Sequence, residues 1–427
     1  NHMDQQNSFF VKGHIIYSDE SYNLIIKEDS YLLVLDGKVE GVRKEIPALY
    51  KSLPVYDYGN SLVLPGFSDL HVHASQYPYR GVGGDYELLE WLKLYAFPEE
   101  RKYKELSYAK KAYHQFVEDL KHSFTTRASI FATIHKEATL ELRKQLEEEK
   151  IPCYVGLVNR NRNSPSDYRE KDTETALKET EEFICSALKF KYEKPILTPR
   201  FTPSVTRDLR EGLGRLREKY NLSVQSHLDE NPSESKWVKE LEPDCETYSD
   251  TYASCHRFGG DYNCIRAHCI YNNEKEINML KENNVFVAHC PESNLNIASG
   301  MAPIRKYLNL GIKVGLGSDV AGGSSLSLLK AGNLARQVSK RYWRYIDSNR
   351  KPLQTKDVFA MATIQGGSFF GKTGSFLKGY DADIVVVDDS SLRTTRDLNL
   401  SERLERLFYL GLRSRIKAKF IQGNRIL

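Results

Sequence analysis

Two histidines separated by one residue stand where an apolar run ends. The run Leu64-Pro65-Gly66-Phe67-Ser68-Asp69-Leu70 leads directly into His71-Val72-His73. Side chains at positions i and i+2 of a strand project from the same face, so the two imidazoles can bind one ion. Imidazole is a common ligand for zinc, and a catalytic zinc site takes about three protein ligands and leaves a position open for water. The motif alone is weak, because two unrelated core or surface histidines give the same pattern.

Three further candidate ligands each follow a short apolar run. They are His227, His268 and Asp319. In a barrel of alternating strands and helices, the chemistry lies at the carboxyl ends of the strands. These three side chains and the pair His71 and His73 would then share one rim. The expected position of all five candidate ligands on one rim favours a metal site over five functionally unrelated side chains.

The region from residue 65 to about 375 alternates short apolar strands with amphipathic helices. Besides the strand before His71, strands are expected over 129–133, 153–158, 196–198, 222–226, 264–267, 285–288 and 312–316, which makes eight. Helices are expected over 103–120, 138–149, 174–189, 206–220, 274–282 and 326–345. This alternation predicts an α/β protein built on a (β/α)8 TIM-like barrel with insertions.

Short β-branched and aromatic runs at both ends of the chain predict a second, smaller domain. Strands are expected over 9–17, 22–27, 31–35 and 39–42, and again over 381–388 and 416–421. Turn residues between the first four indicate an antiparallel meander. Neither end supplies enough strands for its own core, so we expect the two ends to fold together. The prediction is a small β-sandwich of residues 4–65 and 376–427, with the catalytic barrel, 66–375, inserted between its halves.

The composition is that of an ordinary soluble protein. The 427 residues include 61 basic and 57 acidic residues, a net charge of +4, spread along the chain. A patch that binds nucleic acid is therefore not indicated. No run approaches the about 18 apolar residues that a membrane helix needs. Seven cysteines without a Cys-x-x-Cys pair favour free thiols and a cytoplasmic protein.

The histidines and the aspartate at the strand ends resemble the amidohydrolase superfamily, and several longer segments resemble its guanine deaminases. These segments are Asp69–Tyr77, Leu89–Leu92, Phe131–His135, Thr198–Phe201, Gln225–Glu230 and Gly315–Gly323. The resemblance spans the barrel and most of the flanking domain, while the loop 159–172 carries little of it. It implies a homodimeric enzyme that hydrolyses guanine to xanthine and ammonia.

The resemblance also implies a metal site. His71, His73, His227 and Asp319 would hold one zinc ion per subunit, and iron, cobalt or manganese would accept the same ligands. Relatives with two metals carry a bridging lysine where this chain has Pro199-Arg200-Phe201, so one ion is expected. Bound zinc lowers the pKa of its water toward about 7, which makes that water a nucleophile at neutral pH.

Three residues would carry out the proton transfers. Asp319 would take the proton of the attacking water. Glu230 would protonate a ring nitrogen and then the departing amine, in the role that a non-ligand glutamate has in zinc deaminases. His268 would hydrogen-bond the attacking water or the substituents of the tetrahedral carbon, although a purely structural role stays open.

Substrate choice would come from Gln76 and Arg200. Guanine presents the acceptors O6 and N7 along one edge, and these fit the donors of an arginine, whereas the amino group of adenine does not. Phe201 would pack nearby, and His227 is also expected at the substrate. A structural salt bridge is the alternative role for Arg200.

Two other functions stay open. A related amidohydrolase would deaminate or dechlorinate another purine, a pterin or a triazine. From a different class, a non-catalytic relative would keep a structural metal and serve as a binding or scaffold protein. Glu230 and Asp319 speak against this, because a structural site needs no acid-flanked water position. The polar segment 159–165 is expected to be a surface loop, either a lid over the pocket or a solvated connection.

Overall fold

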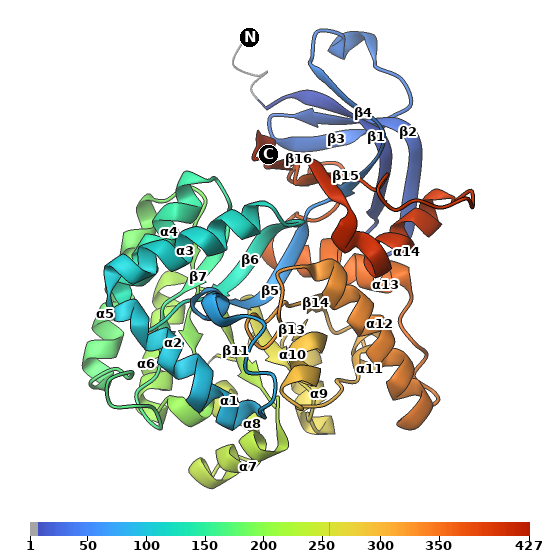
Figure 1. The fold of residues 1–427 in the computed structure, drawn as a ribbon. Coiled ribbons are helices and arrows are strands. Elements are labelled where there is room, and N and C mark those ends of the chain that lie inside the picture. The colour runs from blue at the N-terminus through green and yellow to red at the C-terminus, as the bar shows by residue number, and fades with distance from the viewer. Residues whose placement is uncertain (1–6, 256) are drawn as a thin grey trace.

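A computed structural model describes residues 7–255 and 257–427 of the chain. Their helices and strands form a strand-rich part near both chain ends and a larger part of strands surrounded by helices (Figure 1). The domain boundaries 4–65, 66–375 and 376–427 stay a prediction, and residues 4–6 lie outside the described residues.

One mixed sheet contains strands from both ends of the chain, in the order β17-β16-β15-β4-β1-β2-β3. Its strands are β1 (Phe9–Ser18), β2 (Leu24–Leu35), β3 (Lys38–Arg43), β4 (Val55–Pro65), β15 (Ile384–Asp388), β16 (Arg415–Ile421) and β17 (Asn424–Arg425). Strand β15 pairs with β4, and the two lie side by side in Figure 1. The prediction that the two ends fold together is confirmed.

Two details of this sheet differ from the expectation. The expected strands 22–27 and 31–35 are one strand, β2, because an irregularity opposite Gly13 and Ile15 in β1 accommodates the polar residues between them. The antiparallel meander is confirmed for β1, β2 and β3. Strand β4 was not among the expected strands, and it pairs with β1 in parallel. A parallel neighbour needs a longer connection than a hairpin, and residues 19–54, which include β2 and β3, supply it.

The barrel consists of two four-stranded parallel sheets, β5-β6-β7-β9 and β11-β12-β13-β14. Its strands are β5 (Phe67–His73), β6 (Thr125–Phe131), β7 (Tyr154–Gly156), β9 (Lys194–Pro195), β11 (Val224–Leu228), β12 (Cys264–His268), β13 (Val285–His289) and β14 (Val314–Leu316), and β8 (Val158–Asn159) pairs with β10 (Thr198–Pro199) beside them. A bridge between Leu197 and Val224 joins the two sheets at one seam. At the other seam the Asp319 N–H donates to the carbonyl oxygen of His71 over 2.8 Å. The (β/α)8 fold is confirmed.

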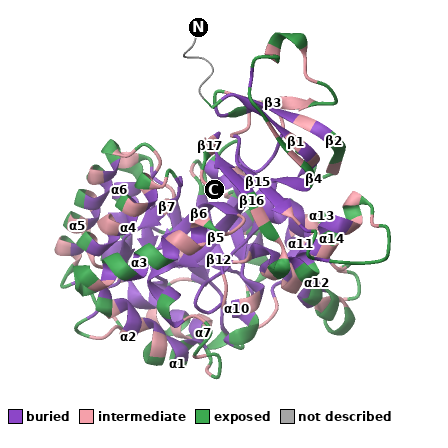
Figure 2. Ribbon diagram, turned by 45° about the horizontal axis from the view of Figure 1, so that its top comes forward, coloured by how far each residue is buried: buried purple, intermediate pink, exposed green. Residues whose placement is uncertain are grey.

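Helices cover the outside of these strands. The six expected ones are α3 (Leu106–Lys121), α4 (Lys136–Glu148), α5 (Thr173–Ser186), α6 (Arg207–Tyr220), α9 (Glu274–Glu282) and α12 (Leu328–Tyr345). Shorter ones are α1 (Leu88–Trp91), α2 (Phe97–Glu100), α7 (Pro232–Leu241), α8 (Tyr248–Ala253), α10 (Pro291–Asn296), α11 (Ile304–Asn309), α13 (Thr355–Ala360) and α14 (Leu400–Leu410). Most residues of the barrel strands are buried, while the helices expose their outer faces (Figure 2). This is the burial expected when helices shield a parallel sheet.

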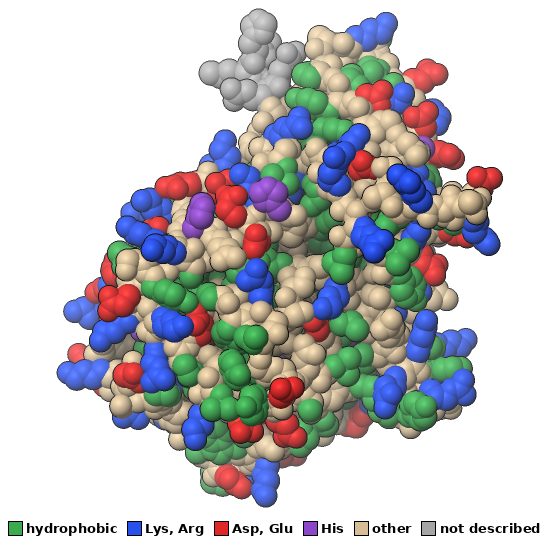
Figure 3. Space-filling view, viewed as in Figure 1, with side chains coloured by type: hydrophobic (Ala, Val, Ile, Leu, Met, Phe, Trp, Pro, Cys, Tyr) green, Lys and Arg blue, Asp and Glu red, His purple; other side chains and the backbone are tan. Residues whose placement is uncertain are grey.

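Positively and negatively charged side chains are interspersed over the face of the molecule in Figure 3. Within the described part of the chain, no helix is long and apolar enough to cross a membrane.

Candidate active site

Five side chains meet at the carboxyl ends of four barrel strands. His71 and His73 lie at the end of β5, His227 in β11 and His268 at the end of β12, and Asp319 follows β14. The ligand atoms of His71, His73 and His227 lie within 4.8 Å of one another, and so do those of His71, His268 and Asp319. All five residues are buried. The structure thus brings together every side chain that the strand ends indicated.

The free imidazole nitrogens of this cluster fit a metal ion. His227 Nδ1 donates a hydrogen bond to the carbonyl oxygen of Arg200 over 2.6 Å, so its Nε2 carries no proton when the ring is neutral. Both ring nitrogens of His71 and Nδ1 of His73 are buried without a hydrogen-bond partner among the described residues. Because buried polar atoms are nearly always satisfied, an ion bound through one nitrogen of each ring would account for part of this set, and imidazoles with one carboxylate suit zinc.

Asp319 is the carboxylate of the cluster. Its Oδ1 lies 3.1 Å from His71 Nε2 and 3.5 Å from His73 Nε2. Its Oδ2 accepts a hydrogen bond from Ser293 Oγ over 2.6 Å. Burial alone would raise the pKa of Asp319, but the charges of His71, His268 and His73 outweigh it and lower this pKa below its ordinary range. The neighbouring imidazoles therefore favour the ionised form of this carboxylate.

Glu230 lies in the loop between β11 and α7. Its Oε1 is 3.3 Å from His268 Nε2. Burial raises the pKa of Glu230 well above its ordinary value, and the carboxylates of Asp319 and Glu234 raise it further. Two neighbouring carboxyl groups whose pKa values are shifted in opposite directions are suited to act as acid and base. Here the pKa of Glu230 is shifted upward and that of Asp319 downward.

His268 stands between these two carboxyl groups. Its Nδ1 donates a hydrogen bond to Asn294 Oδ1 over 2.8 Å. Its Nε2 is 3.3 Å from Glu230 Oε1 and 3.5 Å from Asp319 Oδ2. Burial lowers the pKa of His268 to about 4, so the ring is neutral near pH 7 and Nε2 can accept a hydrogen bond. The contact between His268 and Asn294 was not predicted from the sequence.

The expected substrate-binding residues lie beside this cluster. Gln76 belongs to the short 3-10 helix Ala74–Tyr79 that follows β5, and its Oε1 accepts a hydrogen bond from Ala321 N over 3.1 Å. Arg200 follows β10, and its Nη1 pairs with Glu100 Oε1 at 2.6 Å. The ring centroid of Phe201 is 6.3 Å from that of His227.

A cavity of about 580 Å³ opens next to Phe201. Its other lining residues include Leu92, Phe97, Asn163 and Trp237, and most of its wall is apolar. An apolar cavity beside a few polar groups is the usual form of a small-molecule site. Phe201 connects the wall of this cavity to the histidine cluster.

Residues 62–426 match the amidohydrolase family. A guanine deaminase of Dictyostelium discoideum is 35% identical over 381 residues, which cover 87% of this chain and 84% of that protein. The chain belongs to the guanine deaminases of the amidohydrolase family. The guanine deaminase of Escherichia coli K12 is 32% identical over 413 residues, covering 93% of this chain and 91% of that protein. A crystal structure of guanine deaminase from C. acetobutylicum with guanine bound in its active site superposes with a TM-score of 0.95 at 45% identity, covering 98% of this chain and 100% of that chain.

The polar segment 159–165 is partly buried in this guanine deaminase family member, and the expectation of a surface loop is wrong for its first two residues. Asn159 and Arg160 are fully buried. Asn159 belongs to β8 and pairs with Pro199 of β10. The guanidinium of Arg160 stacks on Phe97, with its Cζ atom 3.9 Å from the centroid of the ring. Strand pairing of Asn159 and stacking of Arg160 on Phe97 therefore account for the burial of these two residues.

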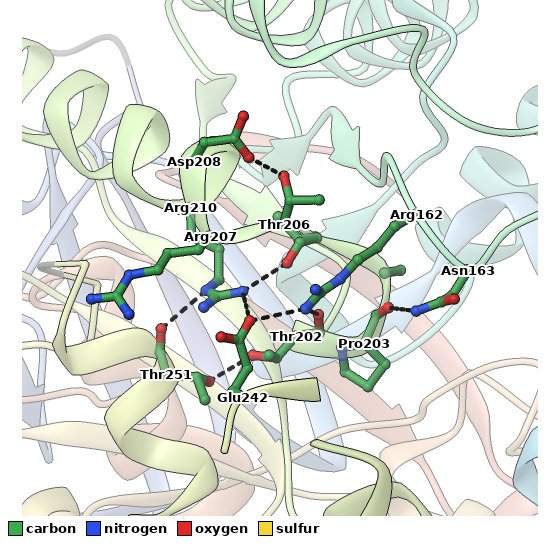
Figure 4. A network of polar contacts seen from close by, with 12 residues as sticks. Arg162, Asn163, Thr202, Pro203, Thr206, Arg207, Asp208, Arg210, Glu242 and Thr251 are labelled. Carbon is green, nitrogen blue, oxygen red and sulfur yellow. Dashed lines mark hydrogen bonds and ion pairs between the residues drawn. The ribbon is translucent and has the colours of Figure 1, made fainter. Parts of the chain in front are cut away.

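The next residues of the segment are fixed to the turn that follows Arg200 and Phe201 (Figure 4). Arg162 Nη2 donates to the carbonyl oxygen of Thr202 over 2.8 Å, and Asn163 Nδ2 donates to that of Pro203 over 2.8 Å. Arg162 Nη2 also pairs with Glu242 Oε1 at 3.0 Å, as does Arg210 Nη1 at 2.8 Å. The segment is thereby held against the cavity that Asn163 lines.

Proposed function

We propose that this chain catalyses the hydrolytic deamination of guanine to xanthine and ammonia. The observation that carries the proposal is the approach of two carboxyl groups to one nitrogen. Glu230 Oε1 and Asp319 Oδ2 lie 3.3 and 3.5 Å from His268 Nε2, beside the other histidines. Membership of the guanine deaminases supports guanine as the substrate.

His71, His73, His227 and Asp319 would hold one zinc ion, or iron in its place. The unsatisfied nitrogens of His71 and His73 support this assignment. When bound, such an ion supplies water that is nucleophilic at neutral pH. Element analysis of protein purified without added metal identifies the native ion.

The side chains would move the protons of the reaction. Asp319, ionised, takes a proton from the water that adds to C2 of guanine. Glu230, protonated, donates to N3, then takes the proton of the new C2 hydroxyl and passes it to the amine, and the proton held by Asp319 restores Glu230. The C2–N bond then breaks, the water oxygen remains on C2 as the new carbonyl, and ammonia leaves. His268 Nε2 accepts a hydrogen bond from the attacking water.

Arg200 and Gln76 would recognise the purine edge, with Phe201 and His227 beside the ring. Among the described residues, the guanidinium of Arg200 makes its hydrogen bond through Nη1. Its Nε and Nη2 therefore stay available to the acceptors O6 and N7 of guanine.

A homodimer and a cytoplasmic location also stay predictions. All seven cysteines are free thiols, which agrees with a reducing compartment. Light scattering of the purified protein measures the oligomeric state.

The test is ammonia release by purified, zinc-loaded protein. We expect release from guanine and not from adenine, cytosine or a triazine, and loss of release in Asp319→Asn. Asp261→Asn is the matched control, because Asp261 is 89% exposed. Zinc-loaded protein that leaves guanine unchanged overturns the proposal. Turnover of a triazine or pterin in its place supports a related amidohydrolase, and inertness toward every amino-heterocycle supports a binding protein.

A further inference from the structure

Glu100 is a buried carboxylate that connects the two side chains expected to read the purine. It is the last residue of α2 and is fully buried. Its Oε1 accepts a hydrogen bond from Arg200 Nη1 over 2.6 Å and another from Gln76 Nε2 over 3.3 Å. Three segments that are far apart in the sequence therefore meet at one oxygen atom.

The second oxygen of Glu100 faces another buried guanidinium group. Its Oε2 lies 3.9 Å from Nη1 of Arg160, which is itself fully buried. The guanidinium of Arg160 lies 3.9 Å from the centroid of the Phe97 ring, and that of Arg200 lies 5.6 Å from the same centroid. Phe97 lines the cavity beside Phe201. The carboxylate thus lies between two buried guanidinium groups, directly behind the cavity wall.

This arrangement has a clear physical effect on Arg200. A long arginine side chain loses much rotational freedom when it binds a substrate, unless a partner already holds it. Burial lowers the pKa of Arg200, but the charge of Glu100 outweighs burial and raises this pKa, so the guanidinium stays charged. Because Nη1 is already bonded to Glu100, the orientation of the remaining donors is set before the purine arrives.

Gln76 is held in a similar way. Its Oε1 accepts from Ala321 N over 3.1 Å while its Nε2 donates to Glu100 over 3.3 Å. An amide whose two ends are both bonded cannot flip without losing a hydrogen bond. Glu100 therefore sets which way the Gln76 amide faces.

We propose that Glu100 is a positioning residue for purine recognition, which holds Arg200 and Gln76 so that their free polar groups meet the O6 and N7 edge of guanine. The inference rests on the proposed function. Glu100 does not touch the substrate in this role, and it acts through Arg200 and Gln76.

The experiment compares Glu100→Gln and Glu100→Asp with wild type. Glu99→Gln is the matched control, because Glu99 is the neighbouring buried carboxylate and pairs instead with Tyr108 and with Lys102. Hypoxanthine is the binding probe, since it has the O6 and N7 edge but no 2-amino group to lose. Calorimetry gives its Kd, steady-state kinetics with guanine give kcat and KM, and element analysis gives the metal content.

We expect Glu100→Gln to raise the Kd for hypoxanthine and the KM for guanine by about 10- to 100-fold, because the buried guanidinium of Arg200 loses its charged acceptor. The fall in kcat is expected to be smaller, with metal content unchanged. Glu100→Asp, which keeps the charge, is expected to fall between wild type and Glu100→Gln, and Glu99→Gln to match wild type. In an Arg200→Ala background the effect of Glu100→Gln should shrink, because the residue it positions is gone.

A Kd and a KM within twofold of wild type in folded Glu100→Gln overturn the inference, and so does an equal loss in Glu99→Gln. A full loss that persists in the Arg200→Ala background also overturns it, because Glu100 would then act independently of Arg200. If Glu100→Gln does not fold, the same comparisons are made with Glu100→Asp. Failure of the proposed function is a separate result, in which wild-type protein neither deaminates guanine nor binds hypoxanthine.

Discussion

The carbonyl oxygen of Arg200 lies 2.6 Å from Nδ1 of His227. A carbonyl oxygen only accepts, so Nδ1 carries the hydrogen and Nε2 is left for a metal ion. The backbone of Arg200 therefore orients a candidate metal ligand, while its guanidinium pairs with Glu100. One residue thus serves two parts of the site through different atoms, and mutation can separate them.

Arg200→Ala is expected to raise the KM for guanine by about 10- to 100-fold while the zinc content stays at the wild-type level. The guanidinium is lost, but the backbone carbonyl that holds His227 remains. Kinetics and element analysis on the same preparation measure both effects. Arg207→Ala, an exposed change on α6, is the control. Loss of zinc together with loss of guanine binding would contradict this separation.

Glu230→Gln is expected to lower kcat by about 10²- to 10⁴-fold, because the amide cannot supply the proton for N3 or the amine. Metal content and hypoxanthine binding should change little, since Glu230 is not among the proposed metal ligands. Single-turnover assays with guanine measure the loss. Glu240→Gln, exposed on the following helix α7, is the matched control. Wild-type turnover by Glu230→Gln would remove Glu230 from the proton-transfer steps.

Removal of the metal is expected to abolish ammonia release and to lower the apparent Tm by about 5 °C or more. Without the ion, the buried nitrogens of His71 and His73 lack partners among the described residues. The protein is dialysed against a chelator and then reloaded with zinc, and both quantities should recover. Ammonia release by protein that element analysis finds free of metal would refute the metal-dependent reaction.

The stability of the protein is expected to fall in mild acid through His135. Burial lowers the pKa of His135 from its ordinary value of 6.5 to about 4, with a further contribution from Lys104. Between these pH values the unfolded chain binds more protons than the folded one, so stability is present above pH 6.5 and is lost toward pH 4. Between pH 7 and pH 5 wild type should therefore lose more of its free energy of unfolding than His135→Gln, by about 1 kcal/mol at this partly exposed site.

Thermal unfolding at both pH values measures this difference. His114→Gln is the control, because His114 is exposed on α3, and it should follow wild type at both pH values. Equal acid sensitivity of His135→Gln and wild type would show that other groups cause the loss.

The sequence by itself determined the barrel and the positions of the candidate ligands. Strand and helix periodicities are local, and strand ends in such a barrel share one rim, so His71 and Asp319 could be placed together from their neighbours alone. The helix α9 agrees with its predicted bounds because Asn273 and Glu276 form a capping box, a signal contained within four residues.

Only the tertiary structure decided which distant groups complete the site. Glu100 lies against Arg200 although 100 residues separate them, and no spacing rule connects a helix end to a strand that follows several elements later. Arg160 is buried because Phe97, from that same distant helix, covers its guanidinium. Local sequence patterns specify where helices and strands begin and end. Contacts between segments that are distant in the sequence depend on how the folded barrel brings the ends of its strands and helices together.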